Sequence, residues 1–159
     1  MPQALVIATR ARNPGSALIR AAQGWRAWSH TASVLSDGRT TVEAMAIPGR
    51  VVTKTVPDLL DRASAHVVLA REVSADAAAA RDAWLLGHVG GRYDYLGAGL
   101  AGWAQWREWD DPARWWCSEL TAAGESAAGL LAVSPYIRGV MPTQCVDLLL
   151  AAGWRVVDA

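Results

Sequence analysis

Cys117 is the residue with the strongest case for chemistry, because of where it lies in the sequence. It follows Trp115 and Trp116, which indicate an extended segment, and it precedes a helical run that starts at Ser118. The first turn of a helix has backbone N–H groups without intrahelical partners and carries the positive end of the helix dipole, so it stabilises a thiolate or an oxyanion. With a cationic neighbour, such surroundings bring a cysteine pKa from about 8.5 down to roughly 3.5–7.5. We predict that Cys117 is a nucleophile; the alternative is a small buried side chain.

A nucleophilic cysteine needs a base, and His30 lies in a context that could supply one. Residues 28–35 are small or β-branched and predict a strand, and residues 40–46 predict a second one. Asp37-Gly38 between them indicates a hairpin turn. In the register that this turn imposes, Glu43 is the diagonal neighbour of His30 on one face of the sheet. Diagonal neighbours are about 7–8 Å apart, within reach of a glutamate and an imidazole.

These residue types form a possible triad. Cys117 would be the nucleophile, His30 the base and Glu43 the acid that fixes the tautomer of the imidazole. The other two histidines are expected to be structural, His66 at the start of a strand and His88 at the end of a helix.

The arrangement also resembles a known family, the circularly permuted papain-like cysteine hydrolases. These are related to the NlpC-type cell-wall peptidases and to the lecithin:retinol acyltransferase group. The motifs that carry the resemblance are Ser29-His30, Val42-Glu43-Ala44, Tyr93-Asp94-Tyr95, Cys117-Ser118-Glu119-Leu120 and Met141-Pro142-Thr143. In ordinary papain-like enzymes the cysteine precedes the histidine, and the permuted branch reverses that order, as here. The resemblance spans residues 15–157.

The resemblance implies an α+β fold, in which an antiparallel sheet or partly closed barrel packs against the helix that carries the nucleophile. The sequence pattern predicts about five or six strands for this sheet. It assigns Cys117, His30 and Glu43 to the triad, with other polar residues in the third position in other members. It also implies a tyrosine upstream of the cysteine near the active site. Tyr93 is the first choice and Tyr95 the second; a phenol there could donate to the oxyanion. A buried tyrosine with a hydrogen-bonded hydroxyl is the alternative.

Tryptophans concentrate around the predicted site. Trp28 precedes His30, and Trp116 precedes Cys117. Trp103, Trp106 and Trp109 lie shortly before Trp116 in the chain. Three readings are open for these indoles: packing in the core, lining an apolar substrate pocket, or contacting a membrane interface. We expect core packing first, with Trp28 and Trp116 as candidate walls of the pocket.

The composition limits the classes of partner. The chain has 159 residues, with 15 basic and 15 acidic side chains, so it offers no electrostatic footprint for nucleic acid. The length is that of a single domain over residues 1–159. No His, Cys or carboxylate spacing indicates a metal site, and no cofactor is expected. Cys145 lies among apolar residues and is predicted to be buried. The sequence shows no secretory signal and no apolar run of about 18 residues, so we expect a protein located in the cytoplasm, unless a phage or secretion system exports it.

The sequence therefore predicts a cysteine-dependent amide hydrolase that forms a thioester intermediate and takes a peptide, isopeptide or cell-wall substrate. Two alternatives stay open. One is acyl transfer or thioester cleavage on a lipid acyl group. The other is a non-catalytic binding or phage-structural module with the same fold.

Overall fold

The computed structural model describes residues 1–100, 113–133 and 139–158. Within them the chain forms one sheet of eight strands and six helices. The strands are β1 Gln3–Ala11, β2 His30–Val34, β3 Thr40–Met45, β4 Arg50–Thr55, β5 Ala63–Glu72, β6 Arg92–Tyr93, β7 Arg114–Trp115 and β8 Arg155–Asp158. The helices are α1 Pro14–Ala22, α2 Val56–Asp61, α3 Ala75–Gly87, α4 Tyr95–Leu100, α5 Cys117–Ala127 and α6 Pro142–Ala151.

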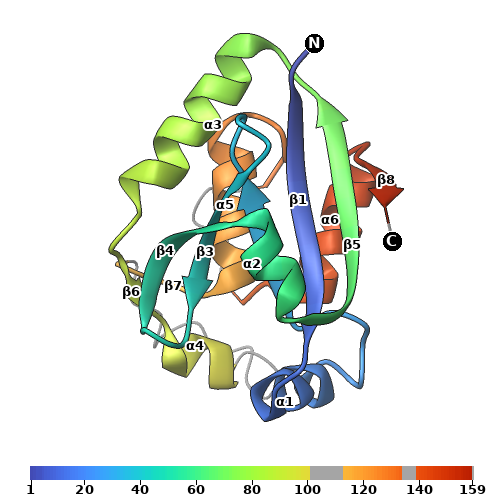
Figure 1. Ribbon diagram of the computed structural model, residues 1–159, viewed down its shortest axis with the longest axis vertical. Helices are drawn as coiled ribbons and strands as arrows, with labels where there is room; N and C mark the ends of the chain where they lie inside the picture. The colour runs from blue at the N-terminus through green and yellow to red at the C-terminus, as the bar shows by residue number, and fades with distance from the viewer. Residues whose placement is uncertain (101–112, 134–138, 159) are drawn as a thin grey trace.

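The strand order in the sheet is β7-β6-β4-β3-β2-β1-β5-β8. Every neighbouring pair is antiparallel except β6 and β7, which are parallel. Helices α5 and α6 pack on one face and α2 on the other, as Figure 1 shows with α2 in front of the sheet and α5 and α6 behind it. The predicted α+β fold, with a mainly antiparallel sheet packed against the helix that begins at Cys117, is confirmed. The strands that carry His30 and Glu43 precede that helix in the chain, which is the permuted order.

The hairpin of β2 and β3 has the predicted register. Ser33 pairs with Val42 and Val34 with Thr41. Asp37 fixes the turn, because its carboxylate accepts hydrogen bonds from the backbone N–H groups of Arg39 and Thr40, each at 2.8 Å.

The two strands then separate. β2 pairs with β1 over five positions and β3 pairs with β4 over six, but β2 and β3 pair with each other at only two. The sheet is therefore split between β2 and β3 at the end where His30 lies.

Alternate residues of β2 face opposite sides of the sheet, as in any strand. The hydroxyl groups of Thr31 and Ser33 bond to side chains of α5. Ala32 and Val34 pack instead with Leu59 of α2 in a separate apolar cluster. His30 consequently belongs to the face that α2 covers, opposite the face on which α5 packs.

A buried ion pair ties α3 and α5 to the sheet. The guanidinium Nε of Arg81 lies 2.8 Å from both carboxylate oxygens of Glu125, and the remaining nitrogens of Arg81 donate to the carbonyls of Val34 and Leu5. Ser33 donates to the same carboxylate. Both charged side chains are almost fully buried, so the pair fixes where α5, and with it Cys117, sits on the sheet.

Candidate active site

Cys117 is the first residue of α5, as predicted. Its preceding residue, Trp116, has extended backbone (φ −107°, ψ 173°) and makes no side-chain cap. The N–H groups of the first turn are therefore left for other acceptors. The backbone N–H of Ser118 is one of the donors that face the Cys117 sulfur.

The split in the sheet supplies a second donor. The Leu35 N–H donates to the Thr40 carbonyl, so the N–H groups of alternate residues, including Thr31, point to the β3 side. β3 is no longer paired with β2 at Thr31. The Thr31 N–H donates instead to the sulfur of Cys117. The start of α5 thus inserts at the point where the two strands part.

His30 is the cation beside this sulfur. Its Nε2 lies 2.8 Å from Oε2 of Glu43, which leaves Nδ1 to face the thiol. Burial disfavours the imidazolium, but the negative charge of Cys117, a hydrogen bond to it and the Glu43 carboxylate raise the pKa of His30 from 6.5 to about 10. Burial likewise opposes ionisation of Cys117, yet the His30 charge and the N–H groups of Thr31 and Ser118 lower the pKa of the thiol below its ordinary value. This geometry favours a thiolate–imidazolium pair.

Glu43 completes the arrangement from β3 and is fully buried. Its Oε1 accepts a hydrogen bond from the Thr41 hydroxyl at 2.8 Å, and Nη2 of Arg62 lies 3.1 Å from both oxygens. Burial alone would raise the pKa of Glu43, but the bond and charge of His30, the charge of Arg62 and the Thr41 bond lower it to about 2. The sequence predicted the contact between His30 and Glu43 but not the part of Arg62, because nothing in the pattern connects the end of a short helix to this carboxylate.

The residues after Cys117 explain why its motif is polar in a buried helix. Ser118 donates to the Val140 carbonyl, and Glu119 accepts a hydrogen bond from the Gly139 N–H at 2.7 Å. The Thr121 hydroxyl donates to the Cys117 carbonyl at 3.1 Å. The bonds to Val140 and Gly139 hold the segment before α6 against the start of α5.

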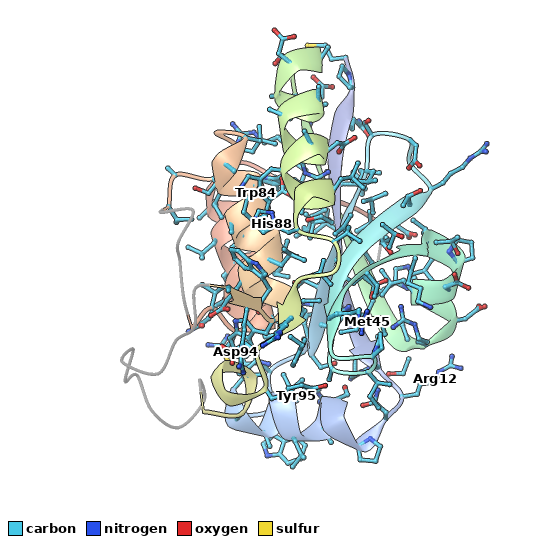
Figure 2. The ribbon with its side chains drawn as sticks, turned by 90° about the vertical axis from the view of Figure 1, so that its left-hand side faces the viewer. Arg12, Met45, Trp84, His88, Asp94 and Tyr95 are labelled. Carbon is cyan, nitrogen blue, oxygen red and sulfur yellow. The ribbon has the colours of Figure 1, made fainter. Side chains whose placement is uncertain are left out.

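The two tyrosines lie in different surroundings. Tyr93 is buried, and its pKa is raised by burial and by the negative charges of Cys117, Tyr95, Asp94 and Glu119 around it. The Tyr93 hydroxyl therefore stays protonated beside Cys117. Tyr95 is exposed and donates to the Ala46 carbonyl in the turn between β3 and β4. Figure 2 shows Tyr95 at the lower end of the molecule, near α1 and α4.

Trp116 corrects one expectation. Its side chain is 1% exposed and packs in an apolar cluster with Leu120, Ala123 and Met141, so it belongs to the core and not to a pocket wall. The extended backbone before α5 directs the indole inward. Trp28 is half-buried and packs at the margin of another core cluster, so both readings of that side chain stay open. Trp103, Trp106 and Trp109 lie outside the described residues.

The site is deep. Cys117 is 2% exposed, and the side chain of His30, at 17%, is its more accessible member. Cys145 is fully buried in α6, as predicted, and burial together with the charges of Glu125 and Cys117 raises its pKa. The pKa of the Cys117 thiol is therefore lowered and that of the Cys145 thiol is raised. In the described part of the chain, no group of three or more His, Cys, Asp or Glu side chains is arranged to hold a metal ion.

Three comparisons place this geometry among known proteins. No family model matches the sequence, and no curated protein matches it. Among solved structures, the chain is similar to the crystal structure of the metalloprotein yiiX from Escherichia coli O157:H7, with a TM-score of 0.61 and 20% sequence identity. The two proteins share a fold. The match covers 79% of this chain and 65% of yiiX, so the chain spans just under two thirds of that protein's length. None of the helices in the described ranges is long and apolar enough to cross a membrane.

Proposed function

We propose that this protein is a cysteine-dependent amide hydrolase that cleaves peptide or isopeptide bonds, including those of cell-wall peptides. One observation carries the proposal: the 2.8 Å contact between His30 and Glu43 lies beside a cysteine that starts a helix and accepts backbone hydrogen bonds. A thiol, an imidazole and an orienting carboxylate are the three groups that nucleophilic acyl chemistry requires.

The reaction follows from the state of these groups. The Cys117 thiolate attacks the carbonyl carbon of the substrate, and the C=O electron pair moves to the oxygen. We assign the Cys117 backbone N–H and the Tyr93 hydroxyl as the donors to that oxyanion. His30, as imidazolium, protonates the leaving amine as the C–N bond breaks, which leaves a thioester. His30, now neutral, takes a proton from water, and the resulting attack releases the carboxylic acid and regenerates the thiolate.

A second candidate is transfer or hydrolysis of lipid acyl groups, and one observation favours it. Leu18, Trp25, Ile47 and Tyr95 are exposed. They belong to α1, the loop after it, the turn between β3 and β4, and α4, which gather at the lower end of Figure 1 where β2 begins. Apolar side chains at that end would suit a substrate with an acyl chain.

A substrate panel separates the two candidates. Amide and ester substrates with short peptide or long acyl groups are incubated with the wild type and with Cys117→Ala, and the mass of the intact protein is measured during turnover. We expect release of amine, a transient adduct on Cys117 and no reaction of the variant. Full activity of Cys117→Ala would remove both candidates, and preference for acyl esters would select the second.

A further inference from the structure

We propose that Arg62 is a positioning residue of the active site, which holds the Glu43 carboxylate in the orientation that orders His30. The inference rests on the proposed function, because it adds a fourth residue to the same triad.

Each nitrogen of the Arg62 guanidinium has a partner, while 38% of the side chain is exposed. Nη2 lies 3.1 Å from both oxygens of Glu43, Nε donates to the Asp58 carbonyl at 2.8 Å, and Nη1 lies 3.8 Å from the sulfur of Met45. Nη2 alone spans both oxygens of Glu43, and the planar guanidinium cannot turn without losing the bond of Nε to Asp58, so Arg62 limits the rotation of the carboxylate as well as balancing its charge. Oε2 is thereby directed at His30, since Thr41 occupies Oε1.

The helix that presents Arg62 is itself anchored. α2 has only six residues and begins with a capping box, in which Thr55 and Asp58 bond to each other's backbone N–H groups. Its Leu59 is buried in the cluster with Ala32 and Val34 of β2. Arg62 is the residue after the last turn, so this short helix delivers the guanidinium to the sheet face on which Glu43 and His30 lie.

The charges around Glu43 show what Arg62 does for His30. Glu43 faces two cations, His30 from β2 and Arg62 after α2, and the neutral hydroxyl of Thr41. His30 in turn faces two anions, Glu43 and Cys117 of α5. Arg62 balances half of this negative charge, which keeps the imidazolium acidic enough to protonate a leaving group. Loss of Arg62 leaves one uncompensated negative charge beside His30, so the imidazolium holds its proton to higher pH.

Three variants separate charge from geometry. Arg62→Gln should lower kcat by about 10- to 100-fold, the range seen when a group that orients a reactive side chain is lost, with KM unchanged. Its alkaline limb should move to higher pH, whereas that of Glu43→Gln should move to lower pH. Arg62→Lys keeps the charge but loses the planar group that bonds to Glu43 and to the Asp58 carbonyl together, so its alkaline limb should stay at the wild-type pH while its kcat falls. A loss of stability alone would not move the two limbs in opposite directions.

Arg12→Gln is the matched control. Arg12 is exposed beside Arg62 and makes no ion pair within the described residues, so this variant should keep the wild-type kcat and pH profile. Thermal unfolding of each variant checks that it is folded. If Arg62→Gln does not fold, the kcat of Arg62→Lys is compared with that of the wild type instead.

A readout without substrate distinguishes this inference from the proposed function. The pH dependence of Cys117 alkylation by iodoacetamide is measured in the wild type and in Arg62→Gln. Alkylation of wild-type Cys117 no faster than Cys145 overturns the proposed function and the role of Arg62 with it. Fast alkylation of wild-type Cys117, combined with an Arg62→Gln variant whose alkylation pH profile and separately measured kcat both equal those of the wild type, overturns the role of Arg62 alone.

Discussion

The backbone N–H of Thr31 donates to the sulfur of Cys117 in the gap where β2 parts from β3. Two adjacent residues of one strand therefore supply both the proposed base, His30, and a donor to the proposed nucleophile. Any movement of β2 relative to α5 would change both contacts together. The Thr31 hydroxyl, which bonds to Thr121 at 3.1 Å, holds that spacing.

The first prediction concerns the pH profile of the wild type. The raised pKa of His30 means that the imidazolium is kept up to about pH 10 and lost above it, while the lowered pKa of Cys117 means that the thiolate forms below the ordinary range of a cysteine. We expect a bell-shaped profile of kcat/KM with its alkaline limb near pH 10. A steady rise through the ordinary range of a free thiol, with no fall on the alkaline side, would contradict the ion pair.

The buried pair of Arg81 and Glu125 gives a prediction about stability. Arg81→Met leaves the Glu125 carboxylate buried without its cation, which should lower the free energy of unfolding by about 3–5 kcal/mol. Arg81→Met combined with Glu125→Leu should recover most of that loss, since no buried charge remains. Urea denaturation of the single and double variants measures the difference.

A control for that comparison is Arg71→Met, which loses one hydrogen bond to the Leu130 carbonyl and should cost about 1 kcal/mol. A double variant no more stable than Arg81→Met would show that the pair does more than neutralise its own charges.

Gly124 should resist substitution although it lies inside a helix. A Cβ at Gly124 would lie 2.8 Å from Cδ2 of Leu85, on the helix that packs against α5. Alanine gains about 1 kcal/mol of helix propensity over glycine, but overpacking a core typically costs about 1–3 kcal/mol. We expect Gly124→Ala to destabilise the protein by about 1 kcal/mol, measured by thermal unfolding. In a Leu85→Ala background the clash is absent, so adding Gly124→Ala should no longer destabilise the protein relative to Leu85→Ala alone. An increase in stability for Gly124→Ala by itself would mean that α3 moves aside easily.

The contact between His30 and Glu43 could be derived from the sequence because it depends on local rules. A short turn fixes the register of a hairpin, and the period of two then decides which residues share a face. Both rules use residues close together in the chain, and both held here. The start of α5 at Cys117 was predictable for the same reason.

The rest of the site depends on contacts that no local rule contains. The alternation of inward- and outward-facing residues in β2 and β3 does not show where the pairing of the two strands ends. Arg62 reaches Glu43 from a helix on the opposite face from α5, across 19 positions of sequence. The strands β6 and β7 have two residues each, too few for a period to be visible, so about five or six strands were expected where eight are found. The position of Trp116 next to Cys117 predicted that it lines a pocket, but the extended backbone before α5 directs its side chain into the core.

The most direct measurement compares the alkylation rates of the two cysteines with iodoacetamide near neutral pH, resolved by peptide mass. Cys117 should react far faster than the buried Cys145, and His30→Gln should remove most of that advantage, because the thiolate loses its cation. Equal rates for the two cysteines, or a Cys117 rate unchanged by His30→Gln, would contradict the claim that the two strands assemble a reactive thiolate–imidazolium pair.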